Sequence, residues 1–141
     1  MNAEEKNLWQ LFKKHLPIGC DHQRIETGST GRGIPDVNLC YHSKELWVEL
    51  KIVKGLQIDL QPEQVSWHHR RIRAGGTTWI LARDKFDGPR KGKGDFLYLW
   101  HGSKVVQAKE HGITDDSYFK KWPTNKNWPS VIQTIFHGVM Q

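Results

Sequence analysis

Three residues in the first half of the chain are of the types that hydrolyse phosphate esters. Asp36 follows Pro35, and Glu49 and Lys51 stand two positions apart in a later apolar stretch. Two carboxylates can hold Mg²⁺ while leaving positions on the metal open for water and phosphate. A lysine beside the metal can orient or deprotonate the water and add positive charge near the transition state. These residue types therefore indicate metal-assisted hydrolysis of a phosphodiester.

Two expected strands must bring these residues together. Residues 36–41 and 45–53 are each typical of a strand, and residues 42–44 suit a short turn between them. Apolar residues alternate with polar ones in the second strand, at Leu46, Val48, Leu50 and Ile52. Because successive side chains of a strand point to opposite faces, Glu49 and Lys51 share a face. If the strands pair as an antiparallel hairpin, Asp36 comes near both.

The remaining patterns predict a mixed α/β fold in a single domain spanning residues 1–141, with a core at about 4–84 and a C-terminal elaboration at about 95–141. Pro62 suits the first turn of a helix, and Gly75-Gly76 suits its end. The expected elements are a helix at 4–16, an irregular strand at 18–27, a glycine-rich loop at 28–33, a helix at 62–74, a strand at 77–82, a mobile basic loop at 84–94, a hairpin of 95–100 with 104–108, and a closing helix at 130–136.

Composition narrows the class of protein. The formal net charge of +6 suits a polyanionic partner such as nucleic acid. The two cysteines, Cys20 and Cys40, lack the paired spacing of a zinc site, and the eight histidines show no tight ligand spacing. The first residues are charged, unlike a signal peptide, and no stretch has the length of a membrane span. We therefore expect no membrane association and a cytoplasmic protein of a bacterium or a phage-infected host cell.

Ile34-Pro35-Asp36 followed by Val48-Glu49-Leu50-Lys51 resembles the two halves of the PD-(D/E)xK nuclease motif. Residues 33–82 most resemble the virus-type replication-repair nuclease (VRR-NUC) and Holliday-junction-resolvase-like branches, including small phage versions. The resemblance implies a restriction-endonuclease-like core of helix, three-stranded antiparallel meander, helix and strand, which the C-terminal hairpin and helices would extend. It implies a Mg²⁺-dependent endonuclease acting on branched or duplex DNA in replication, recombination or repair, with Mn²⁺ able to substitute. Such relatives also imply a homodimer, which suits a two-fold-symmetric junction.

The resemblance assigns roles to individual residues. Asp36 and Glu49 would ligate Mg²⁺ with the Leu50 backbone carbonyl, and Lys51 would position the attacking water. Gln64 matches a position where several branches carry an active-site glutamine or lysine; an ordinary exposed helix residue is an equally good interpretation. Glu5, with Glu4 as the alternative, matches an acidic residue of the first helix, although a first-turn carboxylate stabilised by the helix dipole explains it as well.

Basic and polar residues around this motif are candidates for nucleic-acid contact. Ser29 and Arg32 lie in the glycine-rich loop before Asp36, where backbone N–H groups and a guanidinium could wrap a phosphate. Arg70, Arg71 and Arg73 make the expected helix basic, and solvated charge is the alternative for them. Two rival functions stay open: a general nuclease that needs a partner, and a non-catalytic nucleic-acid-binding or inhibitory protein on the same scaffold. RNA stays open as a substrate.

Overall fold

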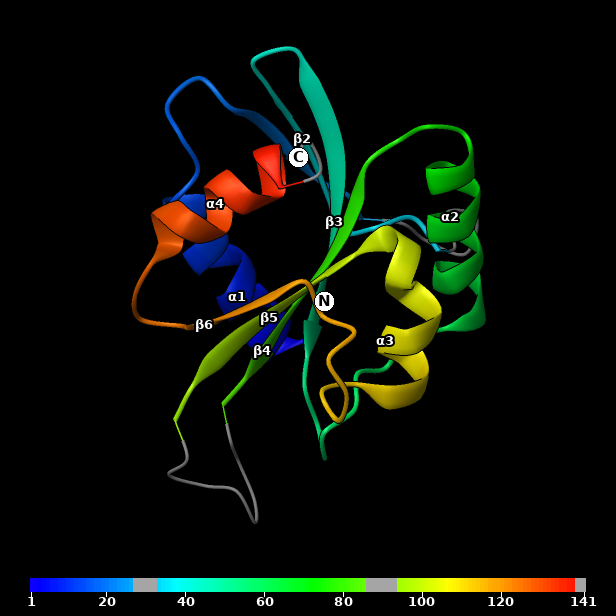
Figure 1. Cartoon of the computed structure of the whole chain (residues 1–141). Coiled ribbons are helices and arrows are strands. Elements are labelled where there is room, and N and C mark those ends of the chain that lie inside the picture. The colour runs from blue at the N-terminus through cyan, green and yellow to red at the C-terminus, as the bar shows by residue number, and fades with distance from the viewer. Residues whose placement is uncertain (27–32, 86–93, 139–141) are drawn as a thin grey trace.

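A six-stranded sheet with helices on both faces organises the chain (Figure 1). The computed structural model describes residues 1–26, 33–85 and 94–138. The strands follow one another across the sheet in chain order, antiparallel except for the parallel pair β3–β4. The elements are α1 (Ala3–Lys14), β1 (Asp21–Arg24), β2 (Val37–Tyr41), β3 (Lys44–Ile52), α2 (Pro62–Arg73), β4 (Thr78–Asp84), β5 (Phe96–His101), the 3₁₀ turn η2 (Gly102–Lys104), α3 (Val105–His111), β6 (Lys120–Pro123) and α4 (Trp128–His137).

The order of elements from α1 to β4 matches the predicted core. A helix, an antiparallel meander of β1, β2 and β3, a second helix and the parallel strand β4 follow one another. The mixed α/β fold class and its core arrangement are therefore confirmed. None of the helices in the described parts of the chain is both long and apolar enough to cross a membrane.

Alternation along the strands divides the core between the two faces of the sheet. The even-numbered residues of β3, such as Leu46 and Leu50, join one buried cluster that includes Leu8 of α1 and Val131 of α4. Ile80 of β4 lies in a second cluster with Trp100, Val105 and Ala108, on the face covered by α2 and α3. Because β3 is central and buried on both faces, its polar residues must also face the protein interior.

The expected hairpin of 95–100 with 104–108 is wrong in its second arm. Residues Val105–His111 form α3, and the partner of β5 beyond β4 is β6. The helix follows a 3₁₀ turn at whose start the His101 ring accepts the N–H of Ser103. Val105 and Ala108, three positions apart, are both buried on one side of the helix. The β-branched residues favour a strand locally, and this tertiary burial outweighs that preference.

Candidate active site

Strand register brings Asp36 to the Glu49–Lys51 segment. Val37 of β2 pairs with Val48 of β3 in the antiparallel ladder, so the residue before Val37 lies opposite the residue after Val48. The carboxylate of Asp36 accepts a hydrogen bond from the Leu50 backbone N–H at 2.8 Å. The hairpin therefore joins the two halves of the sequence motif, as predicted.

Glu49 and Lys51 are buried, with exposed fractions of 1% and 9%. Both contact Gln64 of α2, so they point to the face of β3 that α2 covers, opposite to the even-numbered aliphatic residues. A glutamate and a lysine two positions apart on a strand could simply be a solvated charge pair on an edge strand; their burial on the central strand β3 excludes that interpretation. Removing a carboxylate and an ammonium from water costs several kcal/mol per ion, about as much as a small domain's whole stability margin. Such a cost indicates a function for these groups.

Gln64 of α2 connects the two charged side chains. Its Oε1 accepts hydrogen bonds from Lys51 Nζ at 3.1 Å and from the Gln61 backbone N–H at 2.8 Å, and its Nε2 donates to Glu49 Oε2 at 3.3 Å. The opposite orientation of the amide would place its NH₂ group against two other donors, so the environment fixes the orientation. Of the two interpretations of Gln64, its contacts favour membership of the site.

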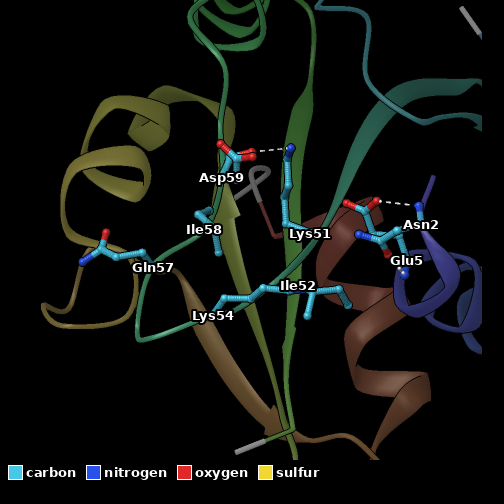
Figure 2. Close-up of a pocket in the computed structure, with 8 residues that line it drawn as sticks. All are labelled: Asn2, Glu5, Lys51, Ile52, Lys54, Gln57, Ile58 and Asp59. Atoms are coloured by element: carbon cyan, nitrogen blue, oxygen red, sulfur yellow. Dashed lines mark hydrogen bonds between the residues drawn. The ribbon is translucent and has the colours of Figure 1, made fainter. Parts of the chain in front are cut away.

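Lys51 has a second acceptor, the backbone carbonyl of Asp59, in the segment before α2 (Figure 2). An ammonium group carries three N–H donors. Gln64 and Asp59 take two of them and fix the position of Nζ. One donor is left for a water or a phosphate oxygen.

His68 lies behind Glu49 in the protein interior. Its side chain is fully buried, its Nδ1 lies 2.8 Å from the hydroxyl of Thr78, and its Nε2 lies 3.6 Å from Glu49 Oε1. Burial, followed by the positive charge of Lys51, lowers the pKa of His68 to about 4. The ring is therefore neutral near pH 7 and carries one proton.

The two carboxyl groups hold their protons unusually tightly. Burial, and then the neighbouring charge of Glu49, raises the pKa of Asp36 to about 8. Burial raises the pKa of Glu49 to about 7, while Asp36 and Lys51 act in the opposite direction. Perturbed carboxyl pairs of this kind are typical of functional sites.

The donor set fits a divalent cation such as Mg²⁺. Glu49 Oε1 is buried and has no hydrogen-bond partner among the described residues, so protein donors do not saturate this carboxylate. The N–H and C=O of one strand residue point to the same side, so the Leu50 carbonyl faces the side of Asp36. No group of three or more His, Cys, Asp or Glu that could bind a metal occurs within the described ranges. Two carboxylates and a carbonyl match Mg²⁺, which keeps several water ligands.

Glu5 lies at the entrance to the site. An open cleft of about 540 Å³ is lined by Glu5 of α1, by Asn2 directly before this helix, by Lys51 and by Asp59 (Figure 2). The carboxylate of Glu5 accepts a hydrogen bond from the backbone N–H of Asn2, and the side-chain Oδ1 of Asn2 accepts one from the backbone N–H of Glu5. The two residues form a capping box at the start of α1. The negative charge of Glu5 also acts on Glu49. The structural role of Glu5 at the start of α1 is therefore observed, and its catalytic role stays a prediction. Glu4, the alternative, lies 3.6 Å from Lys54.

Of the residues predicted to contact nucleic acid, the structure describes the three arginines of α2. Arg70, Arg71 and Arg73 are exposed on the C-terminal half of α2, away from the helix end that carries Gln64. Ser29 and Arg32 lie outside the described residues. The chain re-enters the described part at Gly33, whose backbone passes close to the first turn of α2.

Two contributors to the site were missed in the sequence, His68 and the carbonyl of Asp59. Helix register gives a partial signal for His68, which is one turn from Gln64 on the same face of α2. Adjacent His69 made that signal ambiguous, since either ring could face the core. A backbone carbonyl leaves no signal in residue types.

The chain was compared with protein-family models, curated proteins and solved structures. No protein-family model matches the chain, and no curated protein matches it. Among solved structures, the chain is similar to Hjc from Archaeoglobus fulgidus, a Holliday junction resolvase of an archaeal hyperthermophile. The identity is 19%, the match covers 72% of this chain and 76% of Hjc, and the TM-score is 0.49. Family membership does not follow from a likeness of this size.

Proposed function

We propose that this chain is a metal-dependent nuclease that hydrolyses phosphodiester bonds of DNA, with branched DNA as the first substrate class to test. The observation that carries the proposal is the buried cluster of Asp36, Glu49 and Lys51, joined through Gln64. A protein that only binds nucleic acid gains nothing from burying two carboxylates next to an ammonium. The motif's resemblance to PD-(D/E)xK nucleases supports the same chemistry.

Each residue has a distinct role in this proposal. Asp36, Glu49 and the Leu50 carbonyl would hold Mg²⁺, which when bound supplies charge neutralisation and activation of water. Lys51, fixed by Asp59 and Gln64, directs its remaining N–H at the attacking water or the phosphate. The water adds to phosphorus, one P–O ester bond breaks, and a phosphate monoester and a hydroxyl result, with the excess proton released to solvent.

Cleavage of a labelled panel tests the proposal: four-way junction, flap, linear duplex, single-stranded DNA and single-stranded RNA, in Mg²⁺ or Mn²⁺. Cutting should disappear in EDTA and in the Asp36→Asn and Lys51→Ala proteins. The preferred member of the panel identifies the substrate class. Equal rates for wild type and both variants would refute the assignment. Tight metal-independent binding without cutting would support the non-catalytic alternative.

A further inference from the structure

Arg71 is held in a fixed position by two tryptophans. Its guanidinium carbon lies 4.5 Å from the ring centre of Trp67 and 5.6 Å from that of Trp47, whose rings meet at 5.3 Å and 62°. A Cβ on Gly76 would lie 2.6 Å from Cδ of Arg71, so the glycine makes room for the arginine stem. Stacking on aromatic rings orients the planar guanidinium and lowers its conformational freedom.

The charge of this ordered arginine is not neutralised. Within the described residues, no carboxylate forms an ion pair with Arg71. The residue is exposed and lines an open hollow with Arg70, Trp67 and Gly75. An arginine that is held in place, exposed and without an ion pair can offer its planar set of N–H donors to a phosphate.

The position of Arg71 relates it to the active site. Arg71 stands on the same side of α2 as Gln64, two helical turns further on, at an axial separation of about 10 Å. Trp47 lies two residues from Glu49 on the same face of β3. A phosphate bound by Arg71 would therefore belong to a nucleotide close to the one that is cut.

We propose that Arg71, oriented by Trp47 and Trp67, binds a backbone phosphate of the substrate close to the scissile bond. The inference rests on the proposed nuclease function for the location of that bond. The proposal predicts different roles for Arg71 and Arg73. Arg73 stands two positions further along α2, has the same charge and is also exposed, but it contacts neither tryptophan ring. A simple attraction between a basic helix and DNA would not distinguish the two.

The test measures the affinity for labelled single-stranded and four-way-junction DNA in EDTA, by fluorescence anisotropy, so that no cleavage is needed. Arg71→Ala should weaken binding about tenfold, and Arg71→Lys nearly as much, because lysine keeps the charge but not the planar fork. Gly76→Ala retains the arginine and should also weaken binding by displacing it. Arg73→Ala should change affinity less than about twofold. Thermal denaturation verifies that each variant is folded.

Equal losses of affinity in Arg71→Ala and Arg73→Ala would overturn this subsite. So would wild-type affinity in both of the single variants Arg71→Lys and Gly76→Ala. Absence of any DNA binding by the wild type would also overturn it. In Mg²⁺, the Arg71→Ala protein should show a raised KM with little change in kcat. If the wild type binds with the predicted pattern and never cuts, the subsite stands and the nuclease proposal fails. If it cuts and all variants bind equally, the subsite alone fails.

Discussion

Nε2 of His68 and Oε1 of Glu49 face each other at 3.6 Å in the protein interior. Neither atom has a hydrogen-bond partner among the described residues. A lone pair on Nε2 would repel the carboxylate, so the proton of the neutral ring belongs on Nε2, with the Thr78 hydroxyl donating to Nδ1. His68 thereby limits the orientations of Glu49 and acts as a positioning residue.

His68→Leu should lower the affinity of the protein for Mn²⁺ or Mg²⁺ about tenfold, because groups behind a metal ligand set its orientation. It should also lower the free energy of unfolding by about 1–3 kcal/mol, since the buried Thr78 hydroxyl loses its partner. Isothermal titration with the metal and urea denaturation measure the two effects. His69→Leu is the matched control, because its ring is exposed. Unchanged metal affinity in His68→Leu would contradict the positioning role.

Gln64→Glu should separate the two functions of the Gln64 amide. A carboxylate can still accept from Lys51 and from the Gln61 N–H, but it cannot donate to Glu49 when ionised. The added negative charge should raise the pKa of Glu49 further and move the rise of cleavage rate to higher pH. The rate measured against pH tests this, with Gln133→Glu at an exposed position of α4 as the control. An unshifted profile would mean that the amide does not act on Glu49.

The metal-free protein should become less stable as pH rises from about 5 to about 9. The pKa values of Asp36, about 8, and Glu49, about 7, lie above their ordinary values of 3.8 and 4.5. The folded state therefore binds more protons than the unfolded state between these limits, and stability is lost as pH rises through the folded pKa values. Urea denaturation in EDTA at several pH values measures this slope. Mg²⁺ should stabilise the protein most at high pH, where its ligands are ionised.

Asp36→Asn should abolish cleavage and yet stabilise the metal-free protein at pH 9, because it removes one of two repelling buried charges. Melting temperatures in EDTA for this variant and the wild type give the comparison. Glu45→Gln, at an exposed position of β3, serves as the control for loss of one negative charge. A lower melting temperature for Asp36→Asn at pH 9 would show that the Leu50 N–H bond outweighs the repulsion.

Gly33→Ala should be both destabilising and inactivating. Gly33 has φ +85°, and an added Cβ would lie 2.3 Å from the Glu63 carbonyl oxygen, so the segment leading to Asp36 would have to move. Gly19→Ala is the matched control, since φ is +91° there and no atom lies within 4 Å of the added Cβ. The backbone cost of about 1–3 kcal/mol is common to both. If Gly33→Ala loses more stability and activity than Gly19→Ala, the difference measures the effect of the close contact with the Glu63 carbonyl. Equal losses in the two variants would show that this contact has no effect.

The sequence by itself determined the sheet elements that carry the proposed chemistry. Alternation along β3 is a local property with a period of two residues, so it assigned Glu49 and Lys51 to one face before their partners were known. The short turn expected at 42–44, which the structure limits to His42 and Ser43, fixed the pairing that brings Asp36 to them. Pro62 and the glycines after α2 likewise set that helix, because they restrict the backbone directly.

Tertiary structure decided the environment of those residues. The burial of Glu49 and Lys51, the choice of His68 over His69 and the stacking of Arg71 on two tryptophans depend on how α2 packs against β3, which no residue spacing specifies. The raised pKa values of Asp36 and Glu49 arise from the same packing, because desolvation is a property of the surroundings. Residues 105–111 became a helix for a related reason: burial of Val105 and Ala108 against the sheet outweighed a weak local preference for a strand.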